Sequence, residues 1–239
     1  MDSRGALRPG PPFRHGCCKK GLSRESQPGP SMSFWGKIFA AGYDRFMAGT
    51  EKAGLSAHRQ ALLAKAAGRV LEIGAGTGAN LPFYRDGVIE LILSEPAEPM
   101  ARRLARRLEG YAIPARVLRA PAEDIPVPER SIDVVVSTLA LCSVADPTRA
   151  LAEVRRVLRP PGLLLFIEHV RSADPKVAAW QDRLRRPWAW FGRGCQTNRR
   201  TLELMRDARF TIRDLRETEL PKAPSIVRPL VVGSAVPRS

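Results

Sequence analysis

A carboxylate and three closely spaced glycines are the residues of this chain that most directly suggest chemistry. Glu72 lies in a short apolar run, residues 70–73, and Gly74, Gly76 and Gly78 follow at alternate positions. An apolar run that ends in turn residues is typical of a buried parallel strand, and glycines let the backbone turn sharply and approach a ligand closely. Ligands of open α/β sheets bind beyond the carboxyl ends of the strands. This stretch therefore predicts a site for a nucleotide-type cofactor.

Two cofactors fit this pattern. The dinucleotide fingerprint G-x-G-x-x-G/A is met loosely by Gly74, Gly76 and Ala79, with Glu95 at about the expected distance. The second pattern is an acidic residue inside the strand followed by G-x-G-x-G, and the chain has Glu72 ahead of its three glycines. That pattern resembles the first motif of class I S-adenosylmethionine-dependent methyltransferases. The resemblance implies that Glu72 approaches the amino end of the methionine moiety and that the glycines line the cofactor.

Downstream landmarks favour S-adenosylmethionine over a dinucleotide. A second predicted strand ends at Glu95, whose carboxylate could accept hydrogen bonds from both ribose hydroxyls; the alternative is a surface acid at a strand end. The loop of residues 120–126 resembles the family's G-x-A-E-x-L-P loop, which lies against adenine. In this chain Pro121 replaces the usual acid ahead of Ala122. The resemblance therefore leaves the adenine contact to Glu123 or to backbone.

The methyl acceptor is expected near the end of the fourth predicted strand, which continues into residues 137–144. Asn80, at the end of the glycine stretch, and Thr138 complete the predicted cofactor-binding residues. A thiol acceptor must lose its proton because the thiolate is the nucleophile, and a phenol or an amine would likewise gain from a base. His169 is the only histidine near the inferred site and is the candidate catalytic base. The alternative is a histidine that hydrogen-bonds local backbone.

The elements that would position these residues alternate between strand and helix. This alternation predicts a doubly wound α/β fold. The family resemblance adds a last helix and a closing hairpin, which gives a mostly parallel seven-stranded sheet with antiparallel C-terminal strands. The predicted strands are residues 70–73, 89–95, 115–119, 132–137, 163–170, 210–219 and 227–236, and the predicted helices are residues 56–67, 97–108, 146–158 and 200–208.

Two residue patterns predict where helices begin. Ser56 is the expected N-cap of the helix that precedes the glycine stretch. Asp146 is the expected N-cap of a later helix with proline at its first position. The buried stripe of that later helix is predicted to comprise Leu151, Val154 and Leu158.

The segment of residues 171–198 interrupts the alternation and is a predicted insertion on the substrate side. It carries Trp180, Trp188, Trp190 and Phe191. Aromatic residues beside strand ends could form the wall of a substrate pocket. They could equally form the core of a covering helix, and the sequence does not distinguish the two.

The start of the chain differs in composition from the rest. Residues 1–31 are basic, rich in proline and glycine and without an apolar period, so a disordered tail is predicted. Met32 is a candidate for the true start, and residues 32–239 are the predicted methyltransferase domain. Residues 34–47 show a helical stripe of aromatic residues. Tyr43 in that stripe could touch the cofactor or pack in the core, and the stripe could also make a shallow peripheral membrane contact.

Composition sets further limits. The 39 basic residues outnumber the 24 acidic ones, for a net charge of +15, which permits attraction to nucleic acid or to an anionic membrane. The basic residues are not interleaved with clustered aromatics, so no nucleic-acid partner is expected. The four cysteines lack zinc or redox spacing, so no metal is expected, and a reducing cytoplasm is the expected location. The sequence contains no run of about 18 apolar residues, so no transmembrane helix is expected.

Later motifs narrow the resemblance, which covers residues 32–239. The chain looks like the methyltransferase-like relatives of vertebrate small-thiol methyltransferases, within the methyltransferase type 11 and quinone-biosynthesis group. This resemblance implies S-adenosylmethionine-dependent transfer to a small apolar or lipid-like acceptor, such as an alkyl thiol. Methylation of RNA or protein, and non-catalytic S-adenosylmethionine binding, are the alternatives. The motifs are Leu-Cys-Ser-Val at residues 141–144, Phe-Ile-Glu-His-Val at residues 166–170, Gly-Cys at residues 194–195, Arg199 and Thr201.

Overall fold

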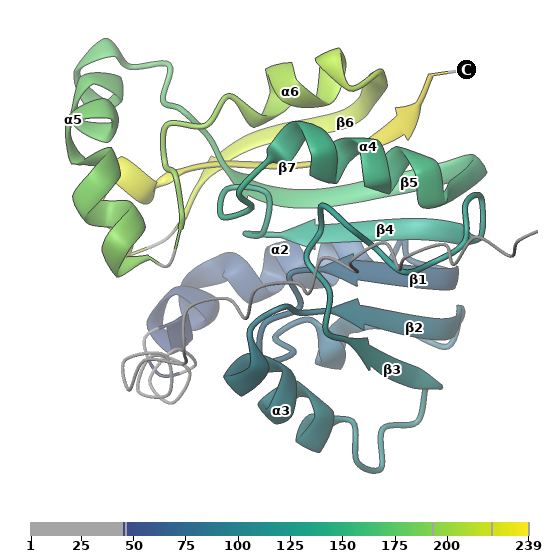
Figure 1. Ribbon diagram of the computed structural model, residues 1–239. Helices are drawn as coiled ribbons and strands as arrows, with labels where there is room; N and C mark the ends of the chain where they lie inside the picture. Colours follow the sequence, from purple (N-terminus) through teal and green to yellow (C-terminus); the bar gives the residue numbers. More distant parts are fainter. Residues whose placement is uncertain (1–44, 46, 193, 221, 239) are drawn as a thin grey trace, which may run out of the picture.

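The computed structural model describes residues 45, 47–192, 194–220 and 222–238 (Figure 1). These residues form a seven-stranded sheet with helices on both sides. The predictions of a disordered tail, of a start at Met32 and of a cofactor contact from Tyr43 lie outside the described residues.

The sheet has the strand order β3-β2-β1-β4-β5-β7-β6. The first five strands pair in parallel, and β7 pairs antiparallel with both β5 and β6. The predicted doubly wound sheet and its closing antiparallel strands are therefore confirmed. The strands are β1 (Gly68–Ile73), β2 (Val88–Ser94), β3 (Ala115–Leu118), β4 (Ile132–Thr138), β5 (Leu158–His169), β6 (Phe210–Glu219) and β7 (Pro229–Pro237).

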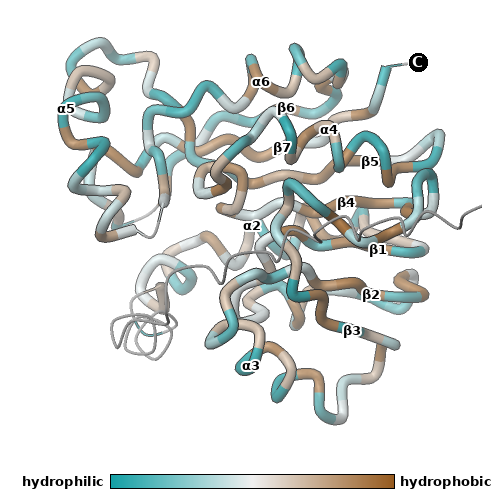
Figure 2. The backbone as a smooth tube through the Cα atoms, in the orientation of Figure 1, coloured by the Kyte–Doolittle hydropathy of each residue, from teal (hydrophilic) through white to brown (hydrophobic). Residues whose placement is uncertain are grey.

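Two apolar cores lie on the two faces of the sheet. Leu63 of α2 and Leu104 of α3 belong to one core, and Trp188 of α5 packs against it. Leu151 of α4 and Met205 of α6 belong to the other core. Figure 2 shows the central strands largely in the hydrophobic colour, as expected for strands buried on both faces. The helices are α2 (Ser56–Leu63), α3 (Glu98–Arg107), α4 (Pro147–Val157), α5 (Pro175–Phe191) and α6 (Thr201–Asp207), with short turns η1 (Glu51–Leu55), η2 (Leu81–Phe83) and η3 (Ser225–Val227).

Alternation along β1 decides which way its carboxylate faces. Leu71 and Ile73 belong to the core beneath α4 and α6, whereas Val70 belongs to the core beneath α2. Successive strand residues point to opposite faces. Glu72 therefore faces the side of α2, and its contacts there build the site described below.

Three predicted helix boundaries are wrong. The helix predicted over residues 56–67 ends at Leu63. Ser56 is not an N-cap, because the helical turn η1 runs into α2 without a break and the Ser56 hydroxyl donates to Glu51 Oε2 at 3.0 Å. Leu158 is not in the helical stripe, because α4 ends at Val157 and Leu158 is the first residue of β5. Two prolines follow at positions 160 and 161. They cannot continue a helix, and a residue ahead of proline is driven toward extended backbone. The predicted cap at Asp146 is confirmed, since its side chain accepts from Arg149 N at 3.0 Å.

The segment after β5 is a covering helix, but it buries only part of its aromatic residues. Trp188 is half-buried and packs against the core, as a covering helix requires. Trp180, Trp190 and Phe191 remain exposed, so the predicted role of core residues does not account for them. Gln181 fastens the helix to the fold, because its amide Nε2 donates to the carbonyls of Val170, Thr197 and Ile226. Among the residues that the structure describes, no helix is both long and apolar enough to cross a membrane.

Candidate cofactor and acceptor site

The three glycines after β1 have different structural roles. Their φ angles are +63° at Gly74, +58° at Gly76 and +90° at Gly78, a region that favours glycine. A Cβ on Gly74 would lie 2.6 Å from Ala140 Cβ, and one on Gly78 would lie 2.7 Å from a Leu81 methyl, so these two glycines permit close packing. A Cβ on Gly76 would meet no described atom within 4 Å. Gly76 is thus the glycine whose backbone faces open space where a ligand can approach.

Glu72 is held by two neutral donors. Asn80 Nδ2 donates to Glu72 Oε1 at 2.9 Å, and the Tyr84 hydroxyl donates to Glu72 Oε2 at 2.7 Å. The side chain is buried, and burial raises the pKa of the Glu72 carboxyl to about 7, against the lowering effect of its hydrogen bonds and of nearby Arg59. At neutral pH this carboxyl is therefore poised to gain charge when a cation arrives. Tyr84 was not predicted from the sequence.

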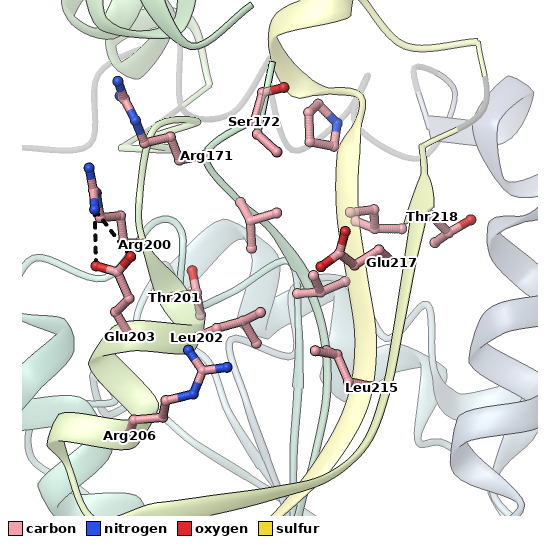
Figure 3. Close-up of a pocket in the computed structure, with 15 residues that line it drawn as sticks. Arg171, Ser172, Arg200, Thr201, Leu202, Glu203, Arg206, Leu215, Glu217 and Thr218 are labelled. Carbon is pink, nitrogen blue, oxygen red and sulfur yellow. Dashed lines mark hydrogen bonds and ion pairs between the residues drawn. The ribbon is translucent and has the colours of Figure 1, made fainter. Parts of the chain in front are cut away.

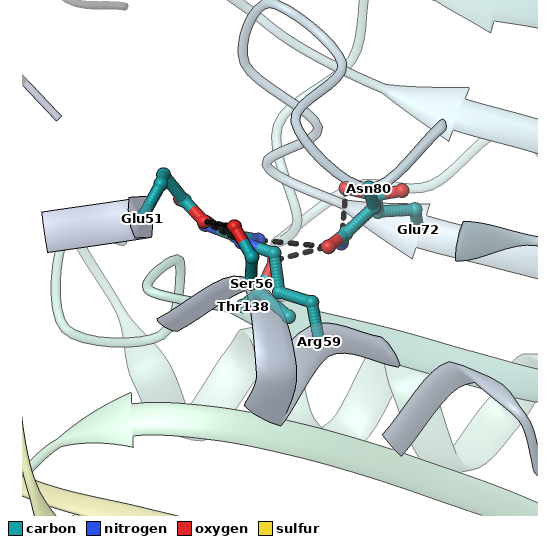
Figure 4. A network of polar contacts seen from close by, with 6 residues as sticks. All are labelled: Glu51, Ser56, Arg59, Glu72, Asn80 and Thr138. Carbon is teal, nitrogen blue, oxygen red and sulfur yellow. Dashed lines mark hydrogen bonds and ion pairs between the residues drawn. The ribbon is translucent and has the colours of Figure 1, made fainter. Parts of the chain in front are cut away.

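Arg59 is the second residue that sequence analysis missed (Figure 4). Its Nη1 donates to Asn80 Oδ1 at 2.7 Å and to Thr138 Oγ1 at 3.1 Å, and its Nη2 pairs with Glu51 at 3.0 Å. It is only 4% exposed and so brings a buried positive charge from α2 to the ends of β1 and β4. One signal was available in the sequence: Arg59 lies three and four residues before Leu62 and Leu63, on the apolar side of the predicted helix.

The Arg59 network unites two of the predicted cofactor residues. Asn80 Nδ2 also donates to Thr138 Oγ1 at 2.9 Å, so Asn80 contacts Glu72, Thr138 and Arg59 together. Asn80 is fully buried and Thr138 nearly so. The structure therefore brings Glu72 and Asn80, which belong to one stretch, together with Thr138, which lies 58 positions after Asn80.

Glu95 lies at the end of β2 and faces the glycine loop. Its Oε2 accepts from Gly76 N at 2.9 Å, and its Oε1 accepts from Ala97 N at 2.8 Å. It is 7% exposed, which excludes the alternative of a surface acid. A carboxylate has about four acceptor sites on its two oxygens and can serve more than two donors.

The two residues predicted to lie near adenine, Ala122 and Glu123, have different surroundings. Ala122 is buried in the core on the α4 side of the sheet. Glu123 is half-buried, and its Oε1 accepts from Asp146 N at 3.0 Å. Glu123 therefore ties this loop to the start of α4, and its carboxylate is partly engaged there.

A third buried carboxylate, that of Glu168, shapes the loop that follows β4. Glu168 Oε1 accepts from the Ser137 hydroxyl at 2.6 Å and from the backbone N–H groups of Ala140 and Leu141 at 3.2 and 3.0 Å. Its Oε2 accepts from Cys142 N at 3.3 Å. Burial raises the pKa of Glu168 and the four donors oppose that shift. Glu168 therefore fixes the backbone beside the expected acceptor.

His169 points away from Glu168, as strand alternation predicts. It is 7% exposed, and burial lowers its pKa to about 4, against the raising effect of hydrogen bonds to the backbone of Pro229 and Val227, so the imidazole is neutral at physiological pH. These backbone contacts agree with the alternative of a histidine that hydrogen-bonds backbone. Its Nδ1 has no hydrogen-bond partner among the described residues, and Trp188 Nε1 and Thr197 Oγ1 share that property. All three atoms belong to the segment between the end of β5 and the start of α6. This segment thus holds buried polar groups that a bound molecule could satisfy.

Two cysteines that are far apart in the sequence meet beside this segment. Cys142 Sγ and Cys195 Sγ are 3.7 Å apart, and both are buried free thiols. The contact raises the pKa of Cys142 and lowers that of Cys195. Arg199 fastens the same loop, because its Nη1 donates to the carbonyls of Leu141 and Val144. No cluster of metal-ligating side chains occurs in the part of the chain that the structure describes.

A cavity of about 470 Å³ opens elsewhere on the surface (Figure 3). It is lined by α6, by β6 and β7 and by the residues that follow β5, and it contains Arg171, Arg206 and Glu217. None of the predicted cofactor residues lines it. This cavity is therefore distinct from the site formed around Gly76.

Comparisons with known proteins agree with this geometry. Residues 71–166 match the model of a methyltransferase domain family. Human thiol S-methyltransferase TMT1B is 37% identical over 180 residues, which cover 73% of each chain. Human thiol S-methyltransferase TMT1A is 34% identical over 171 residues, or 70% of each chain. Phosphatidylethanolamine N-methyltransferase of Cereibacter sphaeroides is 32% identical over half of this chain and 59% of its own.

Solved structures share the fold. A methyltransferase from Thermotoga maritima, described as a possible histamine N-methyltransferase, superposes with a TM-score of 0.65 at 24% identity, covering 84% of this chain and 98% of its own. The YcgJ protein of Bacillus subtilis gives a TM-score of 0.61 at 18% identity, over 77% of this chain and 99% of its own. The predicted class I fold is confirmed. The chain belongs to the thiol S-methyltransferase family and is an S-adenosylmethionine-dependent methyltransferase that acts on a small molecule.

Proposed function

We propose that this protein transfers the methyl group of S-adenosylmethionine to the sulfur of an apolar alkyl thiol. The observation that carries the cofactor part is the pair of buried carboxylates on either side of an open glycine. Glu72 lies at the end of β1, Glu95 at the end of β2, and Glu95 binds the N–H of Gly76. The name of the TMT1 relatives supports the choice of a thiol acceptor.

The donor set fits the chemical groups of S-adenosylmethionine. Glu72 can accept the ammonium of the methionine moiety, and Arg59 supplies positive charge for its carboxylate. Glu95 can accept the two ribose hydroxyls in a charge-assisted pair. Ala122 and Glu123 are the proposed neighbours of adenine, with Glu123 shared between that role and Asp146. When bound, S-adenosylmethionine supplies a methyl group already activated on a sulfonium.

The chain's own contribution to the reaction is chiefly positioning. Holding donor and acceptor in line can lower a barrier by roughly 7–11 kcal/mol. Glu168 and Arg199 fix the loop after β4, which borders the acceptor side of the site. The backbone of Leu139, with φ of +56°, begins that loop and is anchored to Ile167 O at 2.7 Å. The acceptor is thus proposed to lie between this loop and the segment that contains His169.

His169 was predicted to remove the proton of the acceptor thiol. A cysteine thiol has a pKa of about 8.5, and a histidine of pKa about 4 is a weak base even toward a thiol of that acidity. Transfer of such a proton to His169 would be uphill by roughly four to five pK units. We therefore propose that the thiol enters as the thiolate formed in solution. His169, predicted as the base, is then an uncharged residue of the acceptor side.

The test is methyl transfer by the full chain with deuteromethyl-labelled S-adenosylmethionine and three alkyl acceptors of one chain length: a thiol, an alcohol and an amine. The proposal predicts a labelled thioether, equimolar S-adenosylhomocysteine and no product from the other two. Labelled product from the amine or alcohol at rates equal to the thiol would overturn the choice of acceptor. Transfer to RNA or to protein side chains in preference to the thiol would do the same.

A further inference from the structure

The helix α5 carries a row of exposed aromatic and basic side chains that the proposed reaction does not use. Trp180 is 53% exposed, Trp190 79% and Phe191 53%. Large aromatic side chains usually bury most of their surface, so three exposed ones within twelve positions of one helix need an explanation. Of the described residues, only Ile89 and Leu215 are comparable exposed apolar side chains, and they lie on separate strands.

The spacing places the exposed residues on one side of the helix. Positions 176, 180, 183, 187 and 190 follow one another at intervals of three and four, which is one face of an α-helix. That face holds Lys176, Trp180, Arg183 and Trp190, with Phe191 beside it. The opposite face holds buried Ala178 and Gln181, which bind the helix to the fold. Phe191 contacts the half-buried Trp188, with ring centroids 5.8 Å apart, whereas Trp180 and Trp190 project from the helix as an exposed aromatic and basic stripe.

The charged side chains of this helix are mostly basic. Lys176, Arg183, Arg185 and Arg186 are exposed, and Asp182 is the acid of the helix. The carboxylate of Asp182 is already engaged by Arg171 Nη1 and Asn198 Nδ2. Arg183 lies over the ring of Trp180, with 5.5 Å between the guanidinium carbon and the ring centroid. A surface that complements this stripe must therefore be anionic and must also accept apolar rings.

We propose that the outward face of α5 is a docking surface for the headgroup region of an anionic lipid membrane. Tryptophan is favoured at a membrane interface because its ring is apolar and its N–H is polar. Arginine beside it meets lipid phosphate and carboxylate groups. A helix that lies in the interface with aromatic residues inserted and bases around them is a known mode of peripheral binding. Figure 1 shows α5 at the edge of the molecule, with no sheet beyond it.

The position of α5 gives such docking a consequence. The helix follows β5 directly and lies at the end of the sheet toward which β1 and β4 point (Figure 1). The cofactor residues lie at that same end. A membrane on this face would be close to the acceptor side of the site, so that an apolar molecule could enter from the lipid. This face does interleave aromatic and basic residues, contrary to the expectation from the sequence, and such a surface can also stack nucleic-acid bases. A nucleic acid nevertheless fits less well, because single strands are bound in grooves that follow the backbone, whereas this face is an isolated helix.

The experiment is sedimentation of the full chain with phosphatidylcholine vesicles, with and without phosphatidylserine. We expect binding to the anionic vesicles, weakened by salt, and little binding to the neutral ones. The triple variant Trp180→Ser, Trp190→Ser, Phe191→Ser should reduce binding by about tenfold or more, and so should Arg183→Gln with Arg186→Gln. Unchanged circular dichroism and melting temperature show that the variants fold.

Matched controls separate this face from the general surface. Ile89→Ser with Leu215→Ser removes exposed apolar side chains elsewhere. Arg102→Gln with Arg106→Gln removes two exposed bases from α3. Both controls should bind vesicles as the unaltered chain does. Wild-type binding by the triple variant, or equal loss in the controls, would overturn the proposal. Equal binding to neutral vesicles would also overturn it. So would a triple variant that still binds vesicles but no longer self-associates or no longer binds a single-stranded oligonucleotide.

Discussion

Replacing Glu168 by alanine should destabilise the protein more than any other single polar change near the site. Glu168 is fully buried and accepts four hydrogen bonds, from Ser137, Ala140, Leu141 and Cys142. A buried donor left without an acceptor costs about 1–3 kcal/mol. Removing a buried carboxylate, whose pKa burial raises, offsets part of that loss. We expect a net loss of about 3–5 kcal/mol, as for other buried charged networks that lose one member.

The matched variant Glu168→Gln separates the carboxylate's charge from its shape. Three of the four donors bond Oε1 and only the weakest bond, 3.3 Å from Cys142 N, goes to Oε2. A glutamine can keep an oxygen at the first position and place its amide nitrogen at the second. It should therefore cost about 1–2 kcal/mol. The exposed Glu217→Ala is the control and should stay within about 0.5 kcal/mol of the unaltered chain.

The assay is urea unfolding followed by circular dichroism. For a slope of roughly 2–3 kcal/mol per molar urea, Glu168→Ala should lower the midpoint by about 1–2 M. Amide hydrogen exchange should quicken at Ala140, Leu141 and Cys142 in the same variant, because their N–H groups lose their acceptor. A loss below about 1 kcal/mol would refute the claim that Glu168 holds the loop after β4.

Three further predictions concern the cofactor and acceptor. Burial raises the pKa of Glu72 to about 7, so below that pH the cofactor's ammonium must displace a proton from this carboxyl. The affinity for S-adenosylmethionine, measured by calorimetry, should therefore rise by up to about tenfold per pH unit toward pH 7 and then level off. Glu72→Gln should remove this pH dependence. Gly76→Ala and Gly110→Ala carry similar backbone strain, at φ of +58° and +75° with open space around each Cβ, and each should cost about 1–2 kcal/mol of stability. Only Gly76→Ala should weaken cofactor binding. Activity toward a thiol should rise with pH along the thiol's own ionisation and keep that profile in His169→Gln; a titration step near neutral pH that the variant loses would contradict it.

The sequence predicted those parts of the fold and site that local patterns determine. The apolar run with its glycines placed β1 and the cofactor loop, since strand and turn residues adjoin there. The cap at Asp146 was predictable because a side chain, a proline and a helical period coincide within a few positions. The predicted N-cap at Ser56 was wrong because the residues before it are themselves helical, and the local cap pattern carries no signal of that helix.

The remaining site residues depend on contacts between distant segments. Arg59 reaches Thr138 across 79 positions, and Cys142 reaches Cys195 across 53. Local patterns show that such residues are buried but not which partner they meet. The neutral state of His169 is of this kind too, because it follows from the packing of the segments around it. Partner and protonation state are thus properties of the tertiary structure.

The central claim is that Glu72, Gly76 and Glu95 together bind S-adenosylmethionine. Calorimetric titration of the full chain with S-adenosylmethionine and with NAD tests it most directly, with two matched variants: Glu95→Gln, directly after β2, and Glu90→Gln, within β2. Glu90 lies on the surface of that strand, paired with Arg69 and Arg116. The account predicts binding of S-adenosylmethionine alone, strongly weakened by Glu95→Gln and unaffected by Glu90→Gln. Binding of NAD alone, or equal effects of the two variants, would contradict it.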